Sequence, residues 1–455
     1  MKKLEKRAVM CLILAGVLLA GLGFYVTKWV MYGSEWVSFA ANKHVYTDGR
    51  INTGSIYDEN GDLLLKNTES GKPEYNDSSA VRKATLHAVG DIDGNILTGA
   101  NRAFSGKLVG YNPVTGTYST QDKGRKLYLT INAEVCKTAN KALNGRKGAV
   151  MVYNYKTGNV ICMVSSPNYD PSDPPSGSDD SSSGAYINRC TSAKIVPGSI
   201  FKTVTAAAAI EQISDLNDFS YTCDGTLQFA SSDVDKVTCP YAHGKENFEE
   251  ALANSCNCAF AKLSIKLGSS NLEKYTKKAG LTKSYDIDGI HTTAGSFDFP
   301  DSGVNLGWAG VGQYHDLVNP CSMMIYMGAI ANQGKAPVPN LIKKIEFTNG
   351  WPASFIWTGK TDTLIKASTA KKMTELMHNN VKETYGESNF PGLDLCAKSG
   401  TAEVGGSSEP NAWFTGFLDD DDNPYAFIVL VQNGGNGAEV AGSVANKVLQ
   451  KIVDQ

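Results

Sequence analysis

The sequence predicts an α+β protein in which one antiparallel sheet is combined with a large helical region. Strand patterns lie at both ends of residues 126–455, and helical patterns fill the middle. The chain has 455 residues, of which 42% are hydrophobic, so it can fill more than one core. We therefore expect two folded domains.

The N-terminal stretch predicts a membrane anchor. Residues Ala8 to Val26 form an uncharged run of 19, enough at about 1.5 Å per residue to cross a hydrocarbon layer of about 30 Å. Basic residues precede this run, so we expect residues 1–7 in the cytoplasm, residues 8–28 in the membrane and the remainder outside. The alternative is a cleaved signal peptide, because Ala20 to Gly23 offers small residues, although its apolar region is usually only about 7 to 15 residues long.

Residues 29–125 predict a small β-rich domain. This segment is polar, rich in glycine and irregular, with short strand-like runs and no strong helical period. At Lys126 the pattern changes to an alternating strand followed by a helix over 133–143. The second domain is therefore placed at 126–455.

The remaining strands of the second domain lie far apart in the sequence. Two apolar strands at 149–153 and 159–165 are joined by a hairpin signal. Near the C-terminus, 395–403, 412–418 and 425–432 read as three consecutive strands, and a closing amphipathic helix follows. We expect these distant segments to form one sheet.

The composition argues against several classes of function. The net charge of -3 and the lack of a basic stripe make nucleic acid an unlikely partner. The six histidines are scattered without ligand spacing, and no phosphate-binding glycine loop occurs. We therefore predict no metal and no cofactor.

The ten cysteines do not fit a simple set of disulfides. Cys11 lies in the predicted membrane span, which leaves nine outside and at least one unpaired. Most of the others lie in apolar patterns, where a buried thiol acts as a small hydrophobic group. Cys223 and Cys239 flank a polar loop, and a disulfide between them is left open.

Ser199 is the first candidate catalytic residue. It lies three residues before Lys202 at the start of an Ala-rich helical run, a spacing that places both side chains on one helix face. A lysine kept neutral by burial can remove the proton of a serine and make it a nucleophile. The alternative is a helix N-cap, which is also our interpretation of the second such pair, Ser368 and Lys371.

Ser255 and Asn257 form a second candidate motif, which follows a helical stretch. The hydroxyl can relay a proton to a leaving amine, and the amide can orient the lysine or the substrate backbone. The alternative is a polar cap between two helices.

A third motif runs from Lys398 through Ser399 and Gly400 to Thr401, within a strand. The lysine and the hydroxyls can hold a carboxylate, and Gly400 removes a side chain so that an extended peptide can pair along the strand. The backbone N–H groups of Ser199 and Thr401 can form an oxyanion hole. The alternative is an exposed turn.

In this order, the three motifs resemble those of the class B penicillin-binding proteins, the monofunctional D,D-transpeptidases of peptidoglycan. Further similarity lies in 148–171, 243–260 and 412–417, and in 54–61 of the N-terminal domain. The resemblance implies a penicillin-binding and serine β-lactamase-like transpeptidase domain over 126–455, with a five-stranded antiparallel sheet, helices and an all-helical lobe. It also implies that residues 29–125 are a pedestal domain similar to the family's dimerisation domain.

The resemblance assigns a role to each motif. Ser199 is acylated by the penultimate D-Ala of a stem peptide, and β-lactams acylate the same serine. Lys202 is the base, Ser255 the proton relay and Asn257 the orienting amide. Lys398, together with Thr401, contacts the substrate carboxylate and the oxyanion.

Some positions depart from the family pattern, and they concern partners more than catalysis. Thr53 and Glu59 replace two arginines of the pedestal element, and Cys136 stands where glutamine is common. The roughly 90 residues between anchor and catalytic domain are too few for a fused glycosyltransferase. By resemblance, the partner that polymerises the glycan is a SEDS-type glycosyltransferase.

Two other functions remain open. A D,D-carboxypeptidase or a β-lactamase-like hydrolase uses the same serine. It differs from a transpeptidase because water, and not an amine, takes the acyl group from the serine. A non-enzymatic β-lactam sensor or division scaffold would retain the same binding pocket, but a sensor is expected to have additional membrane helices. The anchor and the pedestal favour the transpeptidase.

Overall fold

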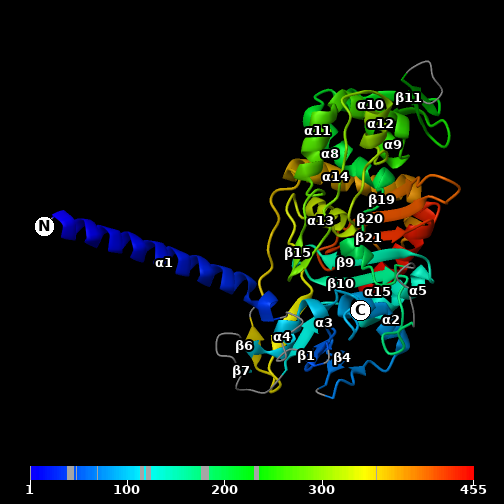
Figure 1. The fold of residues 1–455 in the computed structure, drawn as a ribbon. Helices are drawn as coiled ribbons and strands as arrows, with labels where there is room; N and C mark the ends of the chain where they lie inside the picture. The colour runs from blue at the N-terminus through cyan, green and yellow to red at the C-terminus, as the bar shows by residue number, and fades with distance from the viewer. Residues whose placement is uncertain are drawn as a thin grey trace.

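The computed structural model describes residues 2–37, 46–47, 49–68, 70–112, 117–118, 124–175, 184–229, 235–354 and 356–454. A long N-terminal helix, α1 (Lys2–Val37), projects from an elongated body with the central sheet between a helical lobe and a smaller β-rich region (Figure 1). The predicted α+β class is confirmed.

The central sheet has five strands in the order β10-β9-β21-β20-β19, and every neighbouring pair is antiparallel. The strands are β9 (Gly148–Asn154), β10 (Val160–Ser166), β19 (Leu395–Ala402), β20 (Asn411–Leu418) and β21 (Tyr425–Val431). Val150 pairs with Val429, so the early hairpin lies beside the C-terminal strands. The predicted assembly from distant segments is therefore correct.

Helices cover both faces of this sheet. They are α5 (Ala133–Leu143), α7 (Arg189–Ser192), α13 (Pro320–Ala331) and α15 (Gly442–Val453). Helix α13 packs on β20 and β21, and α5 and α15 pack on β10 and β21 from the other side (Figure 1). Because both faces are covered, all residues of β10 and β20 are buried.

The helical lobe lies beyond β19. Its elements are η1 (Gly198–Phe201), α8 (Lys202–Gln212), η2 (Leu216–Asp218), α9 (Phe248–Ala253), α10 (Asn257–Leu267), α11 (Ser269–Lys278), α12 (Gly303–Gly310), α14 (Ala367–Asn380), η3 (Val381–Tyr385) and η4 (Glu387–Asn389). Short strands complete it: β11 (Ser220–Cys223), β12 (Thr226–Gln228), β13 (Lys236–Thr238) and β14 (Gly244–Asn247). Two further pieces lie outside the lobe: η5 (Gly437–Ala441) packs on β19 and β20, and β15 (Asp286–Ile287) and β16 (Ile290–His291) flank Asp288, which accepts from the N–H groups of Leu341 and Ile342. Helix α8 is buried along most of its length because alanines let its neighbours approach closely.

The N-terminal region contains the predicted short strands and also helices. Its elements are β1 (Tyr46–Thr47), β2 (Arg50–Ile51), β3 (Gly54–Tyr57), β4 (Leu63–Asn67), β5 (Glu74–Tyr75), α2 (Ser79–Val89), α3 (Ala100–Ala103), α4 (Ser105–Val109), β6 (Tyr111–Asn112) and β7 (Thr117–Tyr118). The residues of α2 show no strong helical period, so this helix was not predicted from the sequence. Ser78 caps the N-terminus of α2, because its Oγ accepts a hydrogen bond from the N–H of Val81.

A six-stranded sheet joins the two predicted domains. Its order is β18-β17-β8-β3-β4-β5, where β8 is Lys126–Leu129, β17 is Ile342–Glu346 and β18 is Pro352–Ser354. Strand β3 runs parallel to β8, and β8 pairs with β17. The predicted boundary at residue 125 therefore passes through a sheet that takes strands from both sides of it.

Polar contacts reinforce this junction. The buried Asp58 accepts hydrogen bonds from the N–H groups of Asn60 and Ala133, and Asn132 Nδ2 donates to Glu59 Oε1 at 2.9 Å. Glu59, which departs from the family pattern, thus connects the pedestal to the residue that caps α5.

Acidification is expected to destabilise the contact between α2 and the segment after β10. His87 Nε2 donates to the carbonyl of Ala185 at 2.7 Å, and burial lowers the pKa of His87 from 6.5 to about 4. The unfolded chain therefore binds the proton first as the pH falls. The free energy of unfolding should decrease between pH 6.5 and about 4, by roughly 3 kcal/mol at about 1.4 kcal/mol per pKa unit.

The variant His87→Gln provides the control, because glutamine keeps a side-chain N–H donor and does not titrate. Thermal unfolding of the full chain in detergent at pH 7.5 and pH 5 should show a smaller pH dependence for the variant. Equal pH dependence in the two proteins would contradict the assignment to His87.

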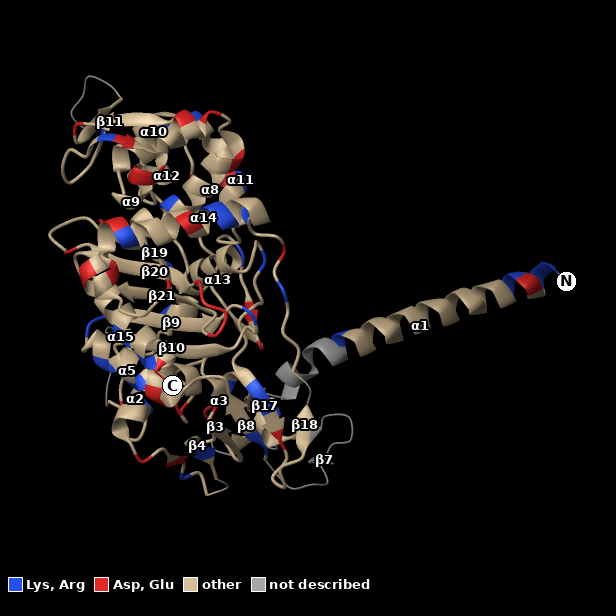
Figure 2. Cartoon of the chain, turned by 180° about the vertical axis from the view of Figure 1, so that it is seen from behind, with Lys and Arg blue, Asp and Glu red and all other residues tan. Residues whose placement is uncertain are grey.

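Helix α1 agrees with the predicted anchor. Among the described residues, one helix is long and apolar enough to cross a membrane, at Lys2–Lys28. It projects away from the body, and charged residues lie at its N-terminal end and again at Lys28, beyond the apolar stretch (Figure 2). None of its apolar window is buried against the protein, so this surface is available to lipid.

Candidate active site

Ser199 lies in η1, the short 3-10 helix that leads into α8. The residue before η1 is Pro197, and the cap of α8 is Phe201, so Ser199 does not cap the helix. Its side chain is partly exposed, and within the described part of the chain its hydroxyl has no hydrogen-bond partner. A free hydroxyl at a solvent-facing turn suits a nucleophile.

Two glycines allow strand β19 to pack on this turn. Gly198 has φ +55, and a Cβ there would lie 2.9 Å from the carbonyl oxygen of Thr401. A Cβ on Gly400 would lie 3.0 Å from Ile200 Cγ2. The missing side chain of Gly400 therefore makes room for η1, and not, as predicted, for a peptide at the strand edge.

Lys202 is fully buried, and its amine forms hydrogen bonds with the second motif. Its Nζ lies 2.5 Å from the carbonyl oxygen of Ser255 and 2.7 Å from Asn257 Oδ1. Ser255 Oγ is 3.2 Å away. Asn257 Nδ2 donates to the carbonyl of Thr238, which fixes the amide with its oxygen toward the lysine.

Lys398 reaches the same hydroxyl from the opposite side. Its Nζ lies 2.9 Å from Ser255 Oγ and 3.0 Å from the carbonyl oxygen of Ser399. Ser255 therefore bridges two buried amines that are 196 positions apart in the sequence (398 − 202). Its backbone is left-handed, with φ 55, which is uncommon for a residue with a side chain.

Burial shifts the pKa of both lysines downward. Burial lowers the pKa of Lys202 to about 8, and nearby Cys239 is the foremost of the groups that offset part of this shift. Burial lowers the pKa of Lys398 well below its usual value, and the charge of Lys202 lowers it further. With a pKa of about 8, Lys202 is partly neutral near physiological pH, so it can act as a general base.

The third motif presents backbone donors along an open edge. Strand β19 is the last strand of the central sheet, and the N–H of Ser399 donates to Tyr385 Oη at 2.9 Å. Because N–H direction alternates along a strand, the N–H of Thr401 points toward the same edge. This edge is where an extended peptide could add as a further strand.

The three motifs line one cavity of about 1070 Å³ between the central sheet and the helical lobe. Its walls include Ser199, Ser255, Asn257, Ser399 and Thr401. Lys202 and Lys398 are fully buried behind this wall and contact it through Ser255. All the predicted site residues therefore lie at or directly beneath the cavity, except Gly400, which packs against η1.

The alternative interpretations of the motifs do not hold. The cap of α10 is Cys256, not Ser255 or Asn257. Lys398 lies inside β19 and is buried, so it is not in an exposed turn. Ser368 lies in the first turn of α14, is exposed and is not among the cavity residues; the cap of that helix is Lys366, so our capping interpretation of Ser368 was wrong.

Several residues of the cavity were not predicted. Tyr385 follows α14 in a one-turn π-helix, and Glu403 and Glu439 add two carboxylates to the wall. No motif in the sequence singles out these residues, because they lie outside the three motifs and meet them only in the folded chain.

Cys223 and Cys239 are free thiols, with their Sγ atoms 3.8 Å apart. The sequence did not decide whether Cys223 and Cys239 form a disulfide, and in the structure they do not. Cys256 and Cys258, on either side of Asn257, lie against Cys239 as well.

Residues 148–454 match the family described as penicillin binding protein transpeptidase domain. Peptidoglycan D,D-transpeptidase PbpA of Mycobacterium tuberculosis is 27% identical over 425 residues, which cover 88% of this chain and 83% of PbpA. The imipenem acyl-enzyme complex of penicillin-binding protein A from M. tuberculosis gives a TM-score of 0.77 at 24% identity, covering 88% of this chain and 98% of that one. The complex between PBP2 and MreC from Helicobacter pylori gives a TM-score of 0.61 at 21% identity, covering 72% of this chain and 64% of that one. Since the family match spans more than half of the sequence, the chain belongs to the penicillin-binding protein transpeptidase family.

Proposed function

We propose that this protein is a peptidoglycan D,D-transpeptidase that forms an acyl-enzyme at Ser199 and is acylated by β-lactams. The observation that carries the proposal is the Lys202–Ser255–Lys398 network beside a partly exposed serine in a peptide-sized cavity. Family membership and the name of the M. tuberculosis relative support it.

The first half-reaction begins with proton transfer from Ser199. A neutral Lys202 has two N–H groups, which match the carbonyl oxygens of Ser255 and Asn257, and its lone pair can accept a proton. Ser199 Oγ then attacks the carbonyl carbon of the penultimate D-Ala. The peptide bond to the terminal D-Ala breaks, and the departing amine takes the proton back from Lys202 through the Ser255 hydroxyl.

The second half-reaction transfers the acyl group to an amine. The N–H groups of Ser199 and Thr401 stabilise the oxyanion in both steps. The Thr401 hydroxyl in the cavity wall contacts the substrate carboxylate, while the buried Lys398 acts on the site through the Ser255 hydroxyl. The neutral amine of a neighbouring stem attacks the ester carbonyl and loses a proton to Lys202. The bond between the acyl carbon and Ser199 Oγ breaks, and Oγ takes that proton. Glu403 and Glu439 in the cavity wall attract the protonated form of the acceptor amine, which loses its extra proton before it attacks.

An exchange assay distinguishes this reaction from hydrolysis. A synthetic pentapeptide ending in D-Ala-D-Ala is incubated with the full chain in detergent and with a labelled D-amino acid. A transpeptidase should release D-Ala and place the label at the peptide terminus. Release of D-Ala without label would support a carboxypeptidase, and neither product would favour a sensor or scaffold.

The proposed topology follows the basic residues before α1. Residues 1–7 are cytoplasmic, 8–28 span the membrane, 29–125 form the pedestal and 126–455 form the catalytic domain outside the cell membrane. Pedestal and catalytic domain share a sheet, so they present one continuous surface above the membrane.

We propose a SEDS-type glycosyltransferase as the partner. Co-purification of the two from solubilised membranes tests this, and its loss without residues 1–28 would place the contact in the anchor.

A further inference from the structure

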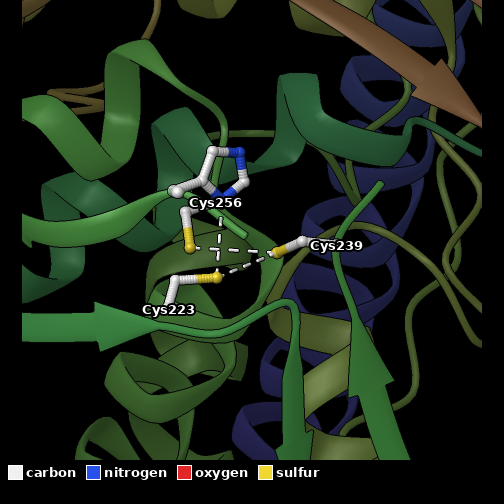
Figure 3. A group of neighbouring side chains, drawn as sticks. Cys223, Cys239 and Cys256 are labelled. Atoms are coloured by element: carbon white, nitrogen blue, oxygen red, sulfur yellow. Dashed lines mark hydrogen bonds between the residues drawn. The ribbon is translucent and has the colours of Figure 1, made fainter. Parts of the chain in front are cut away.

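We propose that Cys223, Cys239, His243 and Cys256 bind one zinc ion in the wall of the active-site cavity. Their ligand atoms, three Sγ and one imidazole nitrogen, all lie within 4.8 Å of one another. The labelled sulfur atoms point toward a common centre (Figure 3). Cys239 and His243 also line the cavity that contains Ser199.

Three of the six distances between the ligand atoms match a tetrahedral site, and all six are within 4.8 Å. Zinc bound to thiolates at about 2.3 Å and to imidazole at about 2.0 to 2.1 Å places two sulfur atoms about 3.8 Å apart and a sulfur and a nitrogen about 3.5 Å apart. The Cys239 Sγ lies 3.8 Å from the Sγ atoms of both Cys223 and Cys256. His243 Nδ1 lies 3.5 Å from Cys223 Sγ.

The surroundings favour thiolates. The N–H of Ala259 donates to Cys256 Sγ, and the N–H of Cys258 donates to Cys239 Sγ, both at 3.4 Å. Backbone N–H donors to sulfur stabilise the charged form that a metal requires. Three thiolates and one imidazole in a closed arrangement select zinc over magnesium or calcium, which prefer oxygen.

A shared ion explains the packing better than a disulfide does. Cys239 Sγ contacts three other sulfur atoms, those of Cys223, Cys256 and Cys258, within 3.8 Å. A disulfide would bring two of these sulfur atoms to within about 2.05 Å of each other and leave the other sulfur atoms unbonded. Cys258 donates its S–H to the carbonyl of Val237, so it is placed outside the ligand set.

The ion would hold the Ser255 motif in place. Cys256 lies between Ser255 and Asn257, and the other three ligands come from the end of β11, the residue after β13 and the loop before β14. Ser255 has a left-handed backbone, which is strained for a residue with a side chain. A metal bond at the next residue would stabilise this turn. The ligands are therefore positioning residues, and this part of the inference rests on the proposed function.

Metal content tests the site without relying on activity. The full chain, purified in detergent from zinc-supplemented medium without chelator, should contain about one zinc per chain. Cys239→Ser and His243→Ala should contain less than about a tenth of that, whereas Cys258→Ala should keep its zinc. Cobalt in place of zinc should give thiolate-to-cobalt absorption in the wild type and in Cys258→Ala only.

Other results would overturn the assignment. A zinc-free wild type with a Cys223–Cys239 disulfide, found by peptide mass, would replace the metal with a covalent bond. Zinc retained by both Cys239→Ser and His243→Ala would be adventitious. Should Cys239→Ser fail to fold, chelator titration of the wild type replaces it, and an unchanged thermal unfolding temperature after zinc loss would count against a structural ion.

The effect on catalysis is measured separately. Removal of zinc, or His243→Ala, should slow acylation by fluorescent penicillin about 10- to 100-fold while Ser199 remains intact. Zinc binding without any penicillin labelling would keep the metal site and overturn the proposed function. An acylation rate unaffected by zinc removal would instead contradict the positioning role.

Discussion

Fluorescent penicillin is expected to label the wild-type protein covalently and to leave Ser199→Ala unlabelled. The hydroxyl at this position is the atom that forms the ester, and no other group at the turn can replace it. The acylation rate should therefore fall by at least about 10⁴-fold. The measurement is in-gel fluorescence after denaturation, followed over time at several penicillin concentrations.

Ser368→Ala is the matched control for this experiment. Ser368 also lies three residues before a lysine, but it is exposed on α14 and is not among the cavity residues. Its labelling should equal that of the wild type. Persistent labelling of Ser199→Ala, or loss of labelling from the control alone, would remove the basis for the Ser199 assignment.

The second large effect is expected from Lys202→Met. Methionine fills a similar volume without an amine, so the Ser199 proton loses its acceptor, and acylation should slow by about 10²- to 10⁴-fold. The fold should also lose some stability, because the Ser255 carbonyl oxygen and Asn257 Oδ1 lose their donor, so thermal unfolding of the variant is measured beside its acylation rate.

The pH profile separates a base from a structural lysine. Lys202 acts when neutral and has a pKa of about 8, so wild-type acylation should rise with pH up to about 8 and then level off. The groups that interact with this amine are Lys398, Cys239, Cys256, Cys258 and Glu246. Residual acylation in Lys202→Met should lack this rise.

Lys266→Met serves as the control for charge removal. Lys266 forms an exposed ion pair with Asp215 on the helical lobe, and its loss should change neither the acylation rate nor the profile. A similar pH profile in Lys202→Met and the wild type would exclude Lys202 as the titrating base.

Local patterns in the sequence predict the parts of the fold that follow from short-range physics. The helix over 133–143 ends where a helical apolar period ends, and the β9–β10 hairpin follows from two apolar runs around a turn. The three catalytic motifs were also recognisable, because each has a fixed local spacing. Helix α2 was missed because its apolar period is weak, and its packing against α5 and β10 supplies the stabilisation.

Contacts between segments far apart in the sequence decided the remaining parts of the fold and of the site. The sheet of β17, β8 and β3 joins segments more than 200 residues apart, and no short window of sequence carries that register. The purpose of Gly400 was misjudged for the same reason, since the group that needs its missing side chain is Ile200 on another element.

The sequence by itself determined the class of the protein, the three motifs and an N-terminal helix that could span a membrane, because these depend on residue types at short, fixed spacings. Only the tertiary structure decided that Lys202 and Lys398 share the Ser255 hydroxyl and that three cysteines and a histidine meet beside it. The physical reason is that both arrangements depend on distances between side chains from separate elements, which packing sets and sequence spacing does not.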